Sequence, residues 1–188
     1  SRQLSLFFKR YMREVLTQGE ALDVSVVYSG GDDVFIIGAW NHVIKAAQRI
    51  HEQFAAFTGG ALTISCGIGM YGEKYPIRLA ADETAALEQR AKEEPGKNSV
   101  SLFDPNQAHT YSWPVLSQKV MQEKYDLVNR FFTGQDERGM AFLYRMTKLL
   151  RMAESDRLNL ARYAYLLARL QPGRDSGYRA LYNDFSKK

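Results

Sequence analysis

Two adjacent carboxylates, Asp32 and Asp33, follow two glycines between apolar runs in the stretch VVYSGGDDVFII. Gly30 and Gly31 suit a tight hairpin turn, because glycine adopts positive φ without a steric cost. Aspartate also favours turns, so the string alone has a purely structural interpretation. Adjacent carboxylates repel each other, however, and their hard oxygen atoms are ligands that Mg²⁺ or Mn²⁺ prefers. The stretch therefore predicts either a structural hairpin or a metal-binding turn.

If the turn is a site, phosphoryl transfer is the chemistry that fits it. Glycines without side chains let a triphosphate approach the backbone closely. Two metal ions about 3.5–4 Å apart can hold an attacking 3′-oxygen and a leaving pyrophosphate in line. Lys97 follows Pro95-Gly96 in a second turn, from which its ammonium can reach β- and γ-phosphates. A lysine in a loop is usually only solvated, so this role depends on the turn lying in the same module.

The elements that position these residues follow from apolar spacing. A first helix ends near Gly19, and its apolar residues recur at helical spacing: Leu4, Phe7, Phe8, Tyr11, Met12, Val15 and Leu16. Residues 22–29 and 33–39 predict a hairpin closed by the glycine turn. Asn41 can cap the next helix, which Gly59 ends. The module continues with a strand over 61–71, a helix over 79–93 and a strand over 99–103.

With one strand placed in front, this order becomes a βαββαβ unit. The sequence therefore predicts an α+β fold: a ferredoxin-like palm over residues 1–110, with an antiparallel-rich sheet that lacks its first strand. The β pattern stops after about residue 110. Residues 111–188 predict an all-α helical domain with helices near 115–132, 138–153, 156–170 and 174–186, joined by short connections that favour a bundle.

Charge divides along the same boundary. Residues 1–110 carry 11 Lys and Arg against 13 Asp and Glu, whereas residues 111–188 carry 14 against 8, so the net charges are −2 and +6. A basic second module can face phosphate backbones or an acidic protein, and the alternative is an ordinary solvated basic face. If phosphate contacts dominate, association should weaken steeply with salt, whereas salt-independent assembly would favour an apolar protein interface.

Composition limits the remaining possibilities. The chain has 188 residues, of which 45% are hydrophobic, so a packed core is expected and general disorder is excluded. One cysteine, Cys66, excludes an internal disulfide and, with no leader-like segment, predicts a cytoplasmic protein. We expect Cys66 to be a small core residue. The three histidines, His42, His51 and His109, do not have metal-ligand spacing and are expected to be ordinary surface or half-buried residues.

Three motifs, YSGGDDVFIIG, ISCGIGMY with YPI and AA after it, and AKEEPGKNSVSLF, resemble one known family. Together with the helical tail they resemble the second palm and C-terminal helical domain of the large subunit of type III CRISPR–Cas effector complexes, the Csm kind. The resemblance implies condensation of ATP into cyclic oligoadenylates when target RNA binds. By motif match it implies catalysis and metal binding by Asp32 and Asp33, and nucleotide binding by Ser29, Gly30, Gly31 and Lys97.

The resemblance also implies what lies outside this sequence. We expect the family's HD nuclease domain, its first palm and the opening strand of this palm, with a further metal carboxylate, to be absent from these residues. The expected partners are other subunits of the complex, guide RNA, target RNA and ATP, with no membrane. Since the family places two ATP molecules between two palms, we expect the isolated chain to bind ATP weakly and to make little or no oligoadenylate.

Two other functions remain open at this point. A diguanylate cyclase also has a hairpin turn, normally GGDEF, but here Asp33 and Val34 replace the Glu and Phe, and the helical tail is foreign to such enzymes. A catalytically silent scaffold subunit of a ribonucleoprotein is the alternative from the binding class, against which the intact SGGDD string argues.

Overall fold

The computed structural model describes residues 2–104, 109–133, 140–153, 155–171, 179 and 182–183. The chain divides into two compact units, Ser1–Ser117 and Gln118–Lys188, which are described separately. The predicted boundary at residue 110 lies seven residues earlier than this division, because a short strand and Trp113 belong to the first unit.

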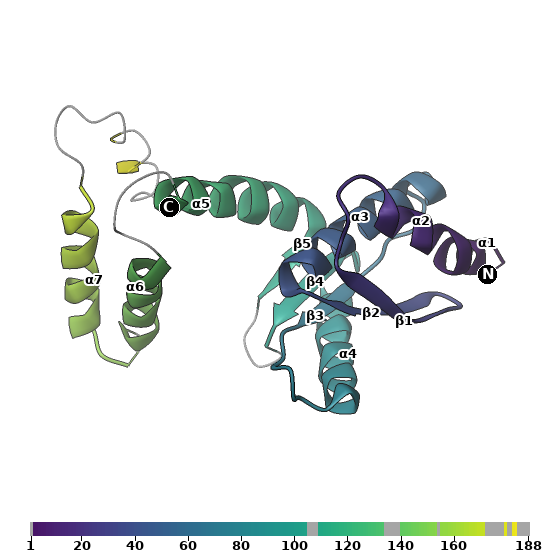
Figure 1. Ribbon diagram of the computed structural model, residues 1–188, viewed down its shortest axis with the longest axis horizontal. Coiled ribbons are helices and arrows are strands. Elements are labelled where there is room, and N and C mark those ends of the chain that lie inside the picture. Colours follow the sequence, from purple (N-terminus) through teal and green to yellow (C-terminus); the bar gives the residue numbers. More distant parts are fainter. Residues whose placement is uncertain are drawn as a thin grey trace. The chain divides into compact units, whose positions relative to one another are not determined.

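The first unit begins with a helical segment, and a hairpin and a βαβ unit follow it (Figure 1). The helical segment consists of α1 Arg2–Leu6, the π-helical η1 Phe7–Tyr11 and α2 Met12–Thr17. The remaining elements are β1 Val24–Gly30, β2 Asp33–Gly38, α3 Trp40–Thr58, β3 Cys66–Gly69, α4 Ile77–Glu93, β4 Ser99–Phe103 and β5 Thr110–Ser112.

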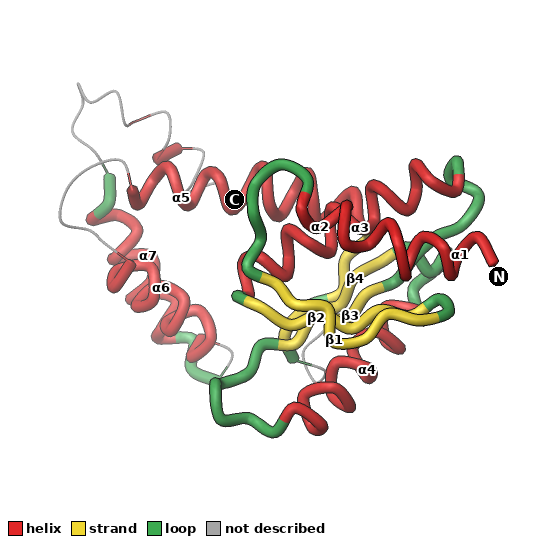
Figure 2. The backbone as a smooth tube through the Cα atoms, turned by 45° about the vertical axis from the view of Figure 1, so that its right-hand side comes forward, coloured by secondary structure: helices red, strands yellow, loops and turns green. Residues whose placement is uncertain are grey.

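The strands form two small sheets. β1 and β2 pair antiparallel, with Val26 opposite Ile36, and a register shift between Val26 and Tyr28 marks a β-bulge. The second sheet has the order β3-β4-β5, in which β3 and β4 are parallel and α4 is the crossover between them. Figure 2 shows the strands on one side of α3, with α4 on the other side of the strands. Gly67 lets α4 approach β3 closely, because a Cβ there would lie 2.4 Å from the Thr84 carbonyl oxygen.

An aromatic core joins the N-terminal segment to α3. The rings of Phe7 and Phe54 meet edge to face with centroids 5.2 Å apart, and Phe8 and Phe54 lie 5.8 Å apart. Val34 and Ile36 of the hairpin pack against this cluster. Because a two-stranded hairpin is marginally stable by itself in water, this apolar contact fixes the hairpin on the unit.

The structure corrects three details of the sequence analysis. Asn41 is not the cap of α3, because the helix begins at Trp40 after Ala39, and no side-chain hydrogen bond caps it. The strand predicted over 61–71 is only Cys66–Gly69. Thr110–Ser112 forms a strand that was not predicted, since three residues carry too little alternation to be recognised without their partner β4. The end of α3 is as predicted: Gly59 adopts φ 60° directly after it.

The second unit is helical over its described residues. Its helices are the π-helical η2 Val115–Tyr125, which begins before the division, α5 Asp126–Thr133, α6 Met140–Ala153 and α7 Leu158–Arg169. α6 and α7 pack through a small core made of Met146, Leu166, Leu170 and Tyr182. The fourth helix predicted, over 174–186, lies outside the described residues except for three positions with helical backbone: Arg179, Tyr182 and Asn183.

Within the part of the chain that the structure describes, no helix has the length and apolarity that a membrane span requires.

The aromatic core predicts a contrast between two phenylalanines of one helix. Phe54 is 4% exposed, whereas Phe57, three residues later, is 37% exposed. We expect Phe54→Ala to lower the free energy of unfolding by about 3–5 kcal/mol, because it leaves a cavity between α3 and the N-terminal segment. Phe57→Ala is the matched control and should cost clearly less. Urea denaturation measures both, and equal losses would contradict this account of the core.

Candidate functional site

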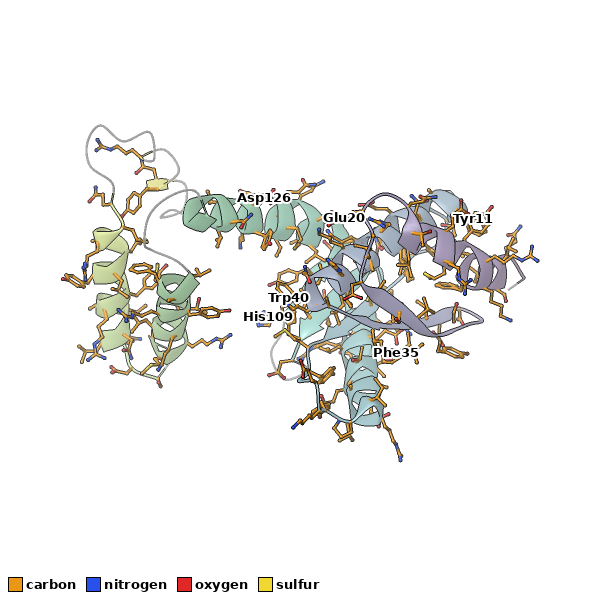
Figure 3. All side chains as sticks on the ribbon, viewed as in Figure 1. Tyr11, Glu20, Phe35, Trp40, His109 and Asp126 are labelled. Carbon is orange, nitrogen blue, oxygen red and sulfur yellow. The ribbon has the colours of Figure 1, made fainter. Side chains whose placement is uncertain are left out.

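Asp32 and Asp33 lie at the tip of the hairpin, and both side chains are exposed. Gly30 pairs with Asp33, so Gly31 and Asp32 form a two-residue turn. Gly31 has φ 66°, and Asp32 is not among the described residues with positive φ, which is the pattern of a type II′ turn with glycine first. Asp33 is the first residue of β2, two residues before Phe35 (Figure 3). The turn therefore presents two carboxylates to solvent on a fixed backbone.

Ser29 anchors this turn to the N-terminal segment. Its Oγ donates a short hydrogen bond to the carbonyl oxygen of Phe8, in the π-helical η1. Because the hydroxyl proton is donated to Phe8, Ser29 Oγ can act only as a hydrogen-bond acceptor toward a nucleotide. The predicted nucleotide contact of Ser29 stays a prediction, and the structure adds a structural role that the sequence did not indicate.

Lys97 occupies an unusual backbone conformation. Its φ is 48°, in the left-handed region, and Gly96 before it has φ 86°. The carbonyl oxygen of Lys97 accepts a 2.6 Å hydrogen bond from Ser65 Oγ, and that of Gly96 accepts one of 3.4 Å from Thr63 Oγ1. The exposed side chain takes part in neither bond. Residues held in such sparsely populated conformations concentrate at functional sites.

The structure adds Lys92 to the candidate residues. Its Nζ lies 2.7 Å from Oε1 of Glu88, one turn earlier on α4. The hydrogen bond to Glu88 is the main cause that raises the pKa of Lys92, and the charges of Asp33 and Asp32 raise it further. Lys92 therefore lies within electrostatic reach of both aspartates. The lysine of the AK dipeptide was a possible signal, but no local pattern relates it to the hairpin.

A half-buried histidine contacts the residue after Lys97. Nε2 of His51, on α3, donates to Oδ1 of Asn98 over 3.1 Å, and the imidazole stacks on Trp113 with centroids 4.6 Å apart. Trp113 is buried and donates from Nε1 to the carbonyl oxygen of Ile64 over 2.9 Å. His51 was predicted to be an ordinary surface or half-buried residue, since partners at positions 98 and 113 leave no local pattern.

The two aspartates are the carboxylates that the hairpin offers to a cation. Among the residues described here, no three His, Cys, Asp or Glu side chains gather as a metal cluster. Two exposed carboxylates still fit Mg²⁺, which commonly takes one or two carboxylates together with substrate phosphates. Cys66 does not contribute, because burial raises the pKa of its thiol to about 12 and keeps it protonated.

An open groove in the second unit lies between α6 and α7. It has a volume of about 480 Å³ and is lined by Arg145, Leu149, Leu158, Ala161, Arg162, Tyr165 and Leu166. None of the predicted site residues lines it, so the groove is no argument for the phosphoryl-transfer chemistry of the hairpin turn.

Each of the two units contains residues that match a known protein family. Residues 1–101 match the second palm domain of Cas10/Cmr2, and residues 129–188 match the second helical domain of Cmr2, a CRISPR RNA silencing complex subunit. The CRISPR system single-strand-specific deoxyribonuclease Cas10/Csm1 (subtype III-A) of Mycobacterium tuberculosis is 41% identical over 199 residues, covering 100% of this chain and 24% of that protein. The protein of the same name from Enterococcus italicus is 45% identical over 169 residues, covering 90% and 21%.

Solved structures agree with these relatives. The Csm1–Csm4 cassette in complex with cA3 has a TM-score of 0.61 at 26% identity, and the cassette with one ATP has 0.58 at 26%. Each covers 100% of this chain and 31% of the matched chain. The matches confirm the predicted α+β palm fold. The chain spans about a quarter of the length of the curated relatives it matches.

The burial of His51 predicts a pH dependence of stability. Burial lowers the pKa of the imidazole from its ordinary 6.5. Just below pH 6.5 the unfolded chain therefore binds more protons than the folded chain. The contribution of neutral His51 to the free energy of unfolding is complete above pH 6.5 and decreases as the pH falls below it. We expect His51→Phe to flatten the curve of unfolding free energy against pH below pH 6.5. An unchanged slope in the variant would contradict the assignment.

Proposed function

Because the chain belongs to the Cas10/Cmr2 family of CRISPR effector proteins, we propose that its first unit is a nucleotidyltransferase palm. In this proposal the palm condenses ATP into cyclic oligoadenylates when a type III complex that contains it binds target RNA. The observation that best supports this proposal is the exposed pair Asp32 and Asp33 on a turn closed by Gly31, with Lys92 within reach of their charges.

Each residue has a defined task in this proposal. Asp32 and Asp33 hold Mg²⁺ or Mn²⁺ by their carboxylate oxygens. When bound, the metal neutralises charge that develops on the attacking and leaving oxygens. Gly31 keeps the turn free of side chains, so that phosphates can approach the backbone, and Gly30 ends β1 beside it.

Two lysines of the α4–β4 region supply the positive charge for the triphosphate. The charges of Asp33 and Asp32 raise the pKa of Lys92, after the larger effect of Glu88. Lys97 is exposed on a left-handed turn. A triphosphate that bridges metal and lysines satisfies both sets of charges, since phosphate oxygens accept hydrogen bonds from ammonium groups strongly. Without it, Lys92 is held by Glu88.

The second unit is proposed to bind other subunits of the complex or its guide and target RNA. The predicted helical module carries a net charge of +6, which suits either phosphate or acidic protein. Structures of similar proteins contain Csm1 together with Csm4, which supports a partner subunit for this chain as well.

One experiment separates the proposed activity from its alternatives. The complete complex is incubated with target RNA and either ATP or GTP in the presence of Mg²⁺, and the products are resolved by mass spectrometry. Cyclic oligoadenylate supports the proposal, cyclic di-GMP indicates a diguanylate cyclase, and the absence of both indicates a silent scaffold.

The paired substitution Asp32→Asn with Asp33→Asn tests the metal ligands. We expect oligoadenylate synthesis to be abolished, because losing both carboxylates removes the metal site and several kcal/mol of transition-state stabilisation. Folding and RNA binding should be preserved, since both side chains are exposed at a turn. Rates are measured by product formation and folding by thermal melting. Synthesis at a near wild-type rate would refute the assignment.

Lys92 is tested against a lysine outside the site. Lys92→Ala should weaken binding of a non-hydrolysable ATP analogue about tenfold, the usual effect of losing a hydrogen bond to a charged group. Lys74→Ala, a change of an exposed lysine in the loop before α4, is the matched control and should bind normally. Calorimetry measures both affinities. Equal affinities for the two variants would contradict a phosphate-binding role of Lys92, whose function would then be limited to its ion pair with Glu88.

A further inference from the structure

The Lys97 turn is held by bonds that do not involve the lysine's own ammonium. A lysine at φ 48° is strained, because its Cβ crowds the following carbonyl oxygen. Lys97 N–H donates to the carbonyl oxygen of Glu94 over 3.0 Å, and Ser65 Oγ donates to the Lys97 carbonyl oxygen. These contacts fix one side of the turn and leave the side chain exposed.

Asn98 fixes the other side. Its carbonyl oxygen accepts a 3.4 Å hydrogen bond from the Trp113 backbone N–H, and its Oδ1 accepts the His51 hydrogen bond. The backbone bond alone leaves the Asn98 side chain free to rotate. His51 adds the second point of attachment and ties the turn to α3, the helix that carries the aromatic core.

The stacking of His51 on Trp113 makes that attachment rigid. The rings are nearly parallel, at 16°, and Trp113 is itself anchored to the Ile64 carbonyl oxygen. Packing therefore sets the plane of the imidazole, and with it the direction of the hydrogen bond from Nε2–H to Asn98. A position needed for packing alone would be filled equally well by a phenyl ring, which has no N–H.

We propose that His51 is a positioning residue for Lys97: through the Nε2–H to Asn98 Oδ1 hydrogen bond it fixes the left-handed turn that aims the lysine at a triphosphate. This inference rests on the proposed function, since it names what orients one of that function's phosphate-binding groups. His51 itself contacts no substrate in this proposal.

Two substitutions separate the hydrogen bond from the stacking. His51→Gln keeps a donor near the position of Nε2 and removes the ring, whereas His51→Phe keeps a ring for Trp113 and removes the donor. Each is made in an effector complex that contains this chain, with Lys97 intact and in the Lys97→Ala background. The readouts are the affinity for AMPPNP, the KM and kcat for ATP, and the melting temperature.

With Lys97 intact, we expect His51→Phe to weaken AMPPNP binding and raise the KM for ATP about fivefold, the effect of one lost neutral hydrogen bond. His51→Gln should stay close to wild type in both, and kcat should change less than KM. Lys97→Ala alone should weaken binding about tenfold. In the Lys97→Ala background, Phe and Gln at position 51 should bind AMPPNP equally, because the two residues act through one interaction.

The contrary outcomes are distinct. If His51→Phe weakens binding to the same extent with and without Lys97, or lowers the melting temperature without changing affinity, His51 is only a packing residue and the inference fails. If Lys97→Ala binds AMPPNP as wild type does, the phosphate-binding role of Lys97 in the proposed function fails, and the inference fails with it.

Discussion

The packing of the hairpin on the aromatic core is the interaction on which the candidate site depends. Asp32 and Asp33 stand at the end of only two strands, and such a hairpin has little stability of its own. Val34 and Ile36 bury one face against the cluster that contains Phe8 and Phe54. The Ser29 bond to the Phe8 carbonyl oxygen adds a directional link near the turn. Burial thus supplies the stability and the hydrogen bond supplies the orientation.

The two lysines of the proposed site come from the βαβ unit. β3 and β4 are parallel, so the chain must cross over through α4 and then turn sharply before β4. That crossover carries Lys92, and the turn after it carries Lys97. Because contacts from α3 and from the segment before β3 hold the turn, the lysine reaches solvent from a backbone that is fixed on several sides.

The division of labour between buried and exposed residues supports the proposed chemistry. The aspartates and Lys97 are exposed and carry no part of the core, while Ser29, His51 and Trp113 use their polar atoms on protein partners. A binding site for a highly charged substrate requires this arrangement, since charges kept in solvent need no internal partner and stay available for phosphate and metal. The geometry of the turn therefore supports the function proposed for it.

The sequence by itself determined the helix and strand order of the palm, the hairpin turn at Gly31 and the family, because all three are written in local spacing and contiguous motifs. It mistook Asn41 for a cap and did not reveal β5, whose three residues are a strand only through pairing with β4. Tertiary structure alone decided that Lys92 lies within reach of the aspartates and that His51 meets Asn98 and Trp113. These partners are 47 to 62 residues apart, by their numbers in the sequence, and no periodic pattern encodes contacts that only the folding of the unit creates.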